Sequence, residues 1–247
     1  MHMRTVVALL TIFFQLGCTE GPSIPQLDLG KTDVGPKADR GRPSFSVTAT
    51  LVDAAKVPLE KCSVCVLENN QKTTSCTTSD SKGRFTISLP AETETGVIVE
   101  KQGVIAPGLS PLWSKSTTQM IELGGWMQVS EAQILAELTQ VGVTPSASKG
   151  LIVVNAVEGA SFALVPPAGQ GPFYADSKDV LDPSLTKLSA TGWGMVADLA
   201  PGTYEILVTP PSGHTCTREM DGWPSSSNTV RVPVLAGFGS GIYVPCS

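Results

Sequence analysis

The sequence predicts an all-β protein: two tandem β-sandwich modules, joined by a short helix and preceded by a disordered N-terminal tether. Short runs of β-branched and aromatic residues alternate with turns, and the chain has 24 glycines and 19 prolines. Charged residues make up 16% of the chain, below the about 25% usual in globular proteins. Many short strands separated by turns are typical of a β-sandwich.

Residues 1–17 have the pattern of an export signal. Arg4 precedes the apolar run 6–14, which is too short for a membrane-spanning helix of about 20 residues. Gly17 and Cys18 follow, and this stretch resembles the lipobox of bacterial lipoproteins, with Gln15 where that motif usually has leucine. The resemblance implies cleavage before Cys18 and acylation of its amino group and thiol, with palmitate or similar chains as the membrane anchor.

The same resemblance predicts the location of the protein. Thr19, rather than aspartate, follows Cys18, and by resemblance to enterobacterial sorting this favours an outer-membrane lipoprotein facing the periplasm or the surface. An ordinary cleaved signal, which would give a secreted protein, is the alternative. Residues 18–43 are rich in proline and glycine and poor in large apolar residues, so we expect them to form a flexible linker.

The first module is expected over residues 44–126. Strict alternation predicts strands with one apolar face, as in Phe45, Val47, Ala49 and Leu51, and again in Phe85, Ile87 and Leu89. Asp80 and Gly83 predict a hairpin turn, because aspartate caps its own backbone and glycine accepts a positive φ.

Residues 77–85, TTSDSKGRF, and the surrounding segment 44–105 resemble the carboxypeptidase regulatory-like family. That family has a transthyretin-like β-sandwich, and Lys61 and Cys62 stand here where it usually has a glycine. The resemblance implies the fold and says little of activity, because one fold hosts many functions.

A helix is expected within the connecting segment 127–148. Ser130 is the predicted N-cap, Gln133 completes a capping box and Gly142 ends the helix. Its predicted apolar stripe, which we expect to lie against a sandwich, consists of Ile134, Leu135, Leu138 and Val141.

A second, divergent β-sandwich is expected over residues 149–247. Residues 192–208 resemble the closing hairpin of the same family, with the turn at Pro201 and Gly202.

Disulfides are the expected role of the cysteines, because an exported chain meets an oxidising environment. We predict Cys65–Cys76 across a hairpin and Cys216–Cys246 at the end of the chain. Cys62 is then left over, unless it replaces Cys65 as the partner of Cys76. A redox or zinc role for Cys62 and Cys65 is disfavoured, because residues three apart in a strand point to opposite faces.

The sequence contains few of the residues and motifs that catalytic sites use. His214 is the only histidine after residue 17, and hydrolase and phosphate-binding motifs are missing. The carboxylate pairs Glu92 and Glu94, and Asp176 and Asp179, are expected to be exposed loop charges. The sequence therefore predicts a protein that is not an enzyme and has no metal site and no cofactor.

Trp223, in the polar loop 220–227, is the tryptophan expected to be exposed and is the candidate ligand-binding residue. Loss of Arg4 with the signal lowers the net charge from −5 to −6, which disfavours nucleic acid as a partner. We expect a cell-envelope lipoprotein that acts in adhesion, scaffolding or interaction. It would meet the membrane through its lipid, and surface proteins or glycans as partners, with oligomeric state open. The alternative is a carbohydrate-binding module that uses Trp223.

Overall fold

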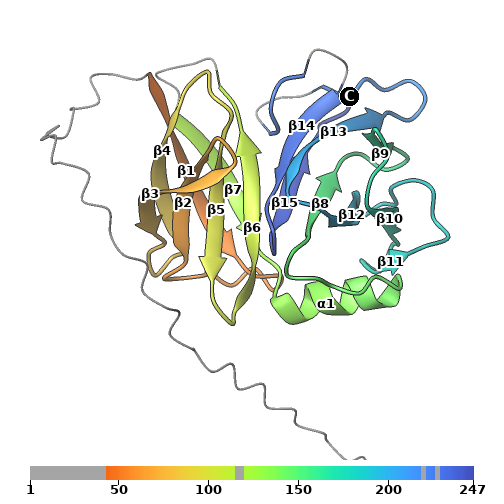
Figure 1. Cartoon of the computed structure of the whole chain (residues 1–247), viewed down its shortest axis with the longest axis horizontal. Helices are drawn as coiled ribbons and strands as arrows, with labels where there is room; N and C mark the ends of the chain where they lie inside the picture. Colours follow the sequence, from red (N-terminus) through yellow and green to blue (C-terminus); the bar gives the residue numbers. More distant parts are fainter. Residues whose placement is uncertain (1–42, 115–119, 218–220, 226–228) are drawn as a thin grey trace, which may run out of the picture. The chain divides into compact units, whose positions relative to one another are not determined.

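The computed structural model describes residues 43–114, 120–217, 221–225 and 229–247 (Figure 1). Strands dominate these residues, which confirms the all-β prediction, and they contain a single helix, α1 (Glu131–Gln140). The N-terminal half contains β1 (Ser44–Val52), β2 (Ser63–Glu68), β3 (Gln71–Thr78), β4 (Arg84–Pro90), β5 (Thr95–Lys101), β6 (Ile105–Leu112) and β7 (Met120–Met127). The C-terminal half contains β8 (Gly150–Asn155), β9 (Ser161–Val165), β10 (Gln170–Ala175), β11 (Leu181–Asp182), β12 (Trp193–Leu199), β13 (Gly202–Thr209), β14 (Thr229–Val234) and β15 (Gly239–Tyr243).

The N-terminal half is a β-sandwich. The alternation that begins at Phe45 buries every second side chain of β1, and Val47 and Leu51 are completely buried. Strand β1 pairs with β4 and β7, and this three-stranded sheet packs on β2, β5 and β6 through one hydrophobic core. Apolar burial on this scale is the main stabilising term of such a domain.

Asp80 forms the predicted turn, but the turn does not close a hairpin. The Asp80 carboxylate accepts hydrogen bonds from the backbone N–H groups of Lys82 and Arg84, both at 2.8 Å. Gly83 has φ +73°, and a Cβ there would lie 2.4 Å from the carbonyl oxygen of Leu51, so only glycine fits. Because β3 and β4 belong to different sheets, the turn carries the chain from one layer of the sandwich to the other.

The Asp80 turn makes stability depend on pH. Hydrogen bonds from the backbone of Arg84 and Lys82 lower the pKa of the Asp80 carboxyl below its ordinary value of 3.8. Its ionised form therefore stabilises the fold above that pH, and the contribution disappears as the pH falls through the folded-state pKa. We expect Asp80→Asn to lower the melting temperature at pH 7, and we expect the difference from wild type to shrink as the pH falls below 3.8, because the carboxylate that accepts these hydrogen bonds becomes protonated. Equal melting temperatures at pH 7 would contradict this expectation.

The C-terminal half has a second core between β9, β13 and β14 on one side and β8, β10, β12 and β15 on the other. Within it, Phe162 and Tyr174 meet edge to face, with ring centroids 5.1 Å apart. As at Asp80, the predicted hairpin at Pro201 and Gly202 connects two sheets, because β12 and β13 do not share one. The strands expected over residues 149–247 are present.

One nine-stranded sheet runs through both halves, in the order β11-β10-β12-β8-β15-β6-β5-β2-β3. Strand β15 lies between the halves and pairs in parallel with β8 and β6, where Ser240 is opposite Leu109 (Figure 1). The last strand of the chain thus joins the two sandwiches by main-chain hydrogen bonds.

Helix α1 begins as predicted and covers the sheet of the C-terminal half. The Ser130 hydroxyl accepts a hydrogen bond from the Gln133 N–H at 3.2 Å, and Gly142 follows the helix with φ +75°. Leu138 is buried in a cluster with residues of β8, β10 and β12. Leu135 is 41% exposed, so the prediction that it belongs to the packed stripe is wrong.

The two faces of the nine-stranded sheet are covered differently. Residues of β8 and β12 alternate between the cluster under α1 and the core beneath β9, β13 and β14. The pairing of β15 with β6 continues this alternation into the N-terminal half, because paired residues point to the same face. It follows that α1 and the β1 sheet lie on one face, and the β9 sheet lies on the other.

Candidate functional site

The predicted lipid-bearing residue, Cys18, lies outside the described residues, as do the export signal and nearly all of the linker. Among the residues that the structure describes, no helix has the length and apolar character needed to cross a bilayer.

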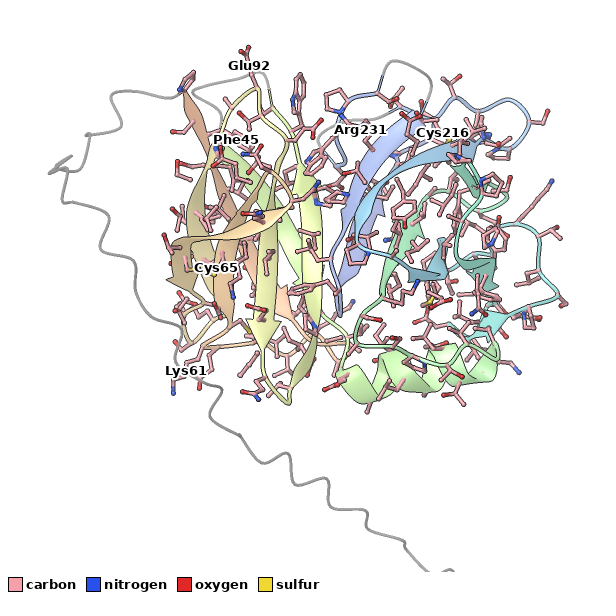
Figure 2. The ribbon with its side chains drawn as sticks, viewed as in Figure 1. Phe45, Lys61, Cys65, Glu92, Cys216 and Arg231 are labelled. Atoms are coloured by element: carbon pink, nitrogen blue, oxygen red, sulfur yellow. A yellow bond between two sulfur atoms is a disulfide. The ribbon has the colours of Figure 1, made fainter. Side chains whose placement is uncertain are left out.

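Both predicted disulfides are present. Cys65–Cys76 joins directly paired residues of β2 and β3, and Cys216–Cys246 joins the end of the chain to the segment after β13. Cys65 lies in the N-terminal half and Cys216 in the C-terminal half (Figure 2). Each half of the protein therefore has its own covalent crosslink.

Cys62 is a free, completely buried thiol that faces the core of the N-terminal half. Its backbone N–H donates to the Ser79 hydroxyl at 2.9 Å, and that hydroxyl donates to the carbonyl oxygen of Leu59 at 2.7 Å. Cys65 points away from this core to reach Cys76, as the strand geometry predicts. The described residues contain no cluster of His, Cys, Asp and Glu suited to a metal ion.

Burial raises the pKa of the Cys62 thiol, which lowers the fraction of reactive thiolate. We expect iodoacetamide at pH 8 to leave Cys62 unmodified in the folded protein and to alkylate it in denaturant, as measured by peptide mass spectrometry. Rapid alkylation of the native protein would contradict this buried placement.

Trp223 does not form an exposed binding site. Its side chain is completely buried, and the indole N–H donates to the carbonyl oxygen of Thr95 at 2.7 Å. The indole packs on Leu67, Ile98 and Leu109. The prediction of an accessible indole is wrong, because the Trp223 side chain lies against apolar side chains on the outer face of β2, β5 and β6.

The Trp223 segment links the two halves. Trp223 exchanges backbone hydrogen bonds with Arg231 of β14, at 2.8 and 3.0 Å, and Gly222 N–H donates to the carbonyl oxygen of Pro111 at 2.9 Å. Arg231 also forms an ion pair with Glu94, and it lies between the labelled residues of the two halves in Figure 2. We call this set of contacts the interhalf clasp. It consists of Gly222, Trp223 and Arg231 with their partners Glu94, Thr95 and Pro111.

Three carboxylates of the two pairs named above form ion pairs or hydrogen bonds within the fold. Glu94 belongs to the clasp, and Asp176 accepts hydrogen bonds from the backbone of Lys178 and Val180 in its own turn. Asp179 accepts a hydrogen bond from the Trp193 indole. His214 is exposed, and its Nδ1 lies 3.3 Å from the carbonyl oxygen of Ser212. These contacts join turns and strands and bring no nucleophile to a base.

The described residues form a groove of about 1070 Å³. It lies on the face of the sheet that carries α1, and its floor consists of residues of β6, β8, β12 and β15. Trp193, Asn155 and Tyr243 are directly paired across β12, β8 and β15, so they form one row on this floor. Trp193 begins an apolar run, which favours a place in the core, and Tyr243 was not among the predicted site residues. Its signal was the alternation of Gly239, Gly241 and Tyr243, opposite in phase to buried Ser240 and Ile242.

No known family model matches the sequence, and no curated protein sequence is similar to it. Solved structures with a similar arrangement include the Bacillus anthracis TIE protein, at 13% identity and a TM-score of 0.30, and a streptococcal ancillary pilin, at 12% and 0.27. The shaft pilin spaA from Lactobacillus rhamnosus GG matches at 11% identity and a TM-score of 0.26. Each match covers 83% of this chain, and 34%, 63% and 98% of the other chain, respectively, so the first two neighbours extend well beyond the matched part. Similarity at this level assigns no function to this chain.

Proposed function

We propose that this chain is a non-enzymatic lipoprotein of the bacterial cell envelope, in which a rigid β unit on a lipid-anchored tether acts as a scaffold, adhesion or interaction module. The observation that carries the proposal is the nine-stranded sheet shared by both halves and closed by the interhalf clasp. A continuous sheet resists relative motion of the halves, which suits display of a surface at a fixed geometry.

The use of polar groups supports a structural role. Among the described residues, every buried side-chain nitrogen or oxygen has a hydrogen-bond partner. Catalytic sites commonly hold titratable groups in clefts with strongly shifted pKa values. Here the lowered pKa values of Asp80 and Asp182 come from hydrogen bonds within their own turns.

The proposed organisation has a signal at 1–17, a linker at 18–43, a regulatory-like sandwich at 44–126, a connecting helical segment at 127–148 and a divergent sandwich at 149–247. The linker would hold the β unit away from the membrane surface, because a proline-rich and glycine-rich chain stays extended and solvated. One acyl chain holds a protein weakly on a membrane, whereas several on Cys18 would anchor it stably.

Metabolic labelling with a palmitate analogue tests the anchor. The full chain should be labelled and should fractionate with membranes, whereas Cys18→Ala should lose both properties. Cys62→Ala is the matched control, because it removes another unpaired cysteine and should stay labelled. Labelling and membrane retention of Cys18→Ala would show that the lipoprotein assignment is wrong.

Crosslinking in intact cells tests the interaction role. The anchored protein should form reproducible adducts with an envelope component, and these adducts should disappear when Trp223→Ala disrupts the clasp. Substrate turnover that is lost on replacing Asp176 or Asp179 would instead identify an enzyme.

A further inference from the structure

We propose that the groove beside α1 binds a neutral or amino-sugar oligosaccharide, with Tyr243 and Trp193 as the aromatic contacts. This proposal rests on the proposed function for its cellular setting, since it names the class of partner that the interaction module would take. It assigns sugar binding to a different face from the one that Trp223 occupies.

The row of paired residues provides two aromatic rings separated by an amide. Trp193, Asn155 and Tyr243 lie on three adjacent strands, which are about 4.8 Å apart, so the two aromatic side chains start about 10 Å from each other. Tyr243 is 53% exposed, and Trp193 is partly exposed at the margin of the α1 cluster. Aromatic faces offer flat apolar area to the C–H groups of a sugar ring, and the phenol and amide can bond its hydroxyls.

Gly241 leaves the floor of the groove open. A Cβ at this position would meet no atom within 4 Å, and the backbone φ lies outside the left-handed region, so neither packing nor conformation requires glycine. Gly239 differs, since a Cβ there would lie 3.2 Å from the Leu151 side chain. Glycine weakens a strand interior and often marks a place where a ligand approaches the backbone closely. Gly241 therefore favours a ligand lying flat on the sheet beside Tyr243.

The polar rim favours an uncharged or cationic ligand. Six carboxylate residues and two lysines line the groove, which would repel anionic ligands. Asp179 is held by the Trp193 indole N–H, and an ionised carboxylate keeps further acceptor sites for sugar hydroxyls. The volume of about 1070 Å³ is slightly above the about 300–1,000 Å³ range of small-molecule sites, which leaves room for several sugar units.

The pairing of β15 leaves little room for an added peptide strand where this strand enters the floor. Extended peptides usually join the free edge of a sheet through main-chain hydrogen bonds. Strand β15 is paired with β8 from Gly239 to Tyr243 and with β6 at Gly239 and Ser240, so its main-chain groups are already paired on the whole β8 side and at the start of the β6 side.

Calorimetry with the full-length protein in detergent tests the proposal, with cello-, xylo-, manno- and chito-oligosaccharides as neutral ligands and oligogalacturonate as the acidic one. At least one neutral oligosaccharide should bind, and oligogalacturonate should not. Tyr243→Ala should weaken binding at least about tenfold, which corresponds to loss of one aromatic contact, whereas Tyr243→Phe should retain most of it. Gly241→Val should abolish binding, because its side chain would fill the floor of the groove. Valine is favoured in β-strands, so we expect this variant to fold.

Val165→Ala is the matched control, since Val165 is 45% exposed on β9, outside the groove. Val165→Ala should bind the oligosaccharide as tightly as wild type does. All variants should have the same melting temperature as wild type. If no neutral oligosaccharide binds, or if binding survives both Tyr243→Ala and Gly241→Val in folded protein, the groove is not a sugar site. That failure would leave palmitate labelling and envelope crosslinking unaffected, so it is distinguishable from failure of the proposed function.

Discussion

Trp223→Ala is expected to lower the free energy of unfolding by about 3–5 kcal/mol, the range for truncating a large buried aromatic side chain. The indole is completely buried against Leu67, Ile98 and Leu109, and it donates a hydrogen bond to Thr95. The change therefore leaves a cavity between the clasp and the sheet and removes the hydrogen bond to the Thr95 carbonyl oxygen. In a protein of this size the melting temperature should fall by roughly 10 °C.

Two further variants separate packing from hydrogen bonding at the clasp. Trp223→Phe keeps a ring in the cavity but removes the N–H donor, and we expect a loss of about 1–3 kcal/mol, the range for an unsatisfied buried polar group. Trp113→Ala removes a tryptophan that is only partly buried at the margin of the same cluster, so it should lower stability less than Trp223→Ala. Urea unfolding measures all three. A loss below about 1.5 kcal/mol for Trp223→Ala would be at odds with the clasp as described.

Removing the Cys216–Cys246 disulfide by a double alanine substitution is expected to lower stability by about 3–4 kcal/mol in the chain-entropy model. The two cysteines are 30 residues apart, and the loop they close contains β14 and β15. Because β15 joins the two halves, the bond also limits fraying of the strand on which the shared sheet depends.

The Cys65–Cys76 disulfide gives the comparison. Its cysteines are only 11 residues apart, so its double alanine variant should lose somewhat less, about 3 kcal/mol. Dithiothreitol should bring wild type to the stability of a variant lacking both disulfides and should leave that variant unchanged. Urea titrations with and without dithiothreitol measure this, and a wild type indifferent to the reductant would contradict the pairing.

Local patterns in the sequence predicted several features of the structure. Alternation predicted the buried face of β1, and the Ser130 cap predicted the start of α1. A hairpin predicted Cys65–Cys76, with Cys62 as the open alternative to Cys65, and the position of Cys246 at the end of the chain predicted Cys216–Cys246. These features depend on side-chain periodicity, on backbone conformation over a few residues and on neighbouring strands, all of which nearby sequence determines.

Pairing across the sandwich was harder to predict. The turns at Asp80 and Gly202 have the expected chemistry, but each connects strands of different sheets. A turn determines where the chain reverses, whereas the choice of sheet depends on which apolar faces meet in the core. The insertion of β15 between the halves is a contact of this long-range kind.

The sequence by itself determined the all-β class, the strand periodicity, the helix cap and the cysteine pairs, because each follows from interactions between residues close in the chain or on adjacent strands. Only the tertiary structure decided the burial of Trp223 and the row formed by Trp193, Asn155 and Tyr243. Polar neighbours in sequence made Trp223 look exposed, yet its surroundings come from β2, β5 and β6. The row depends on strands far apart in the chain, so its register is set by packing of the whole sheet.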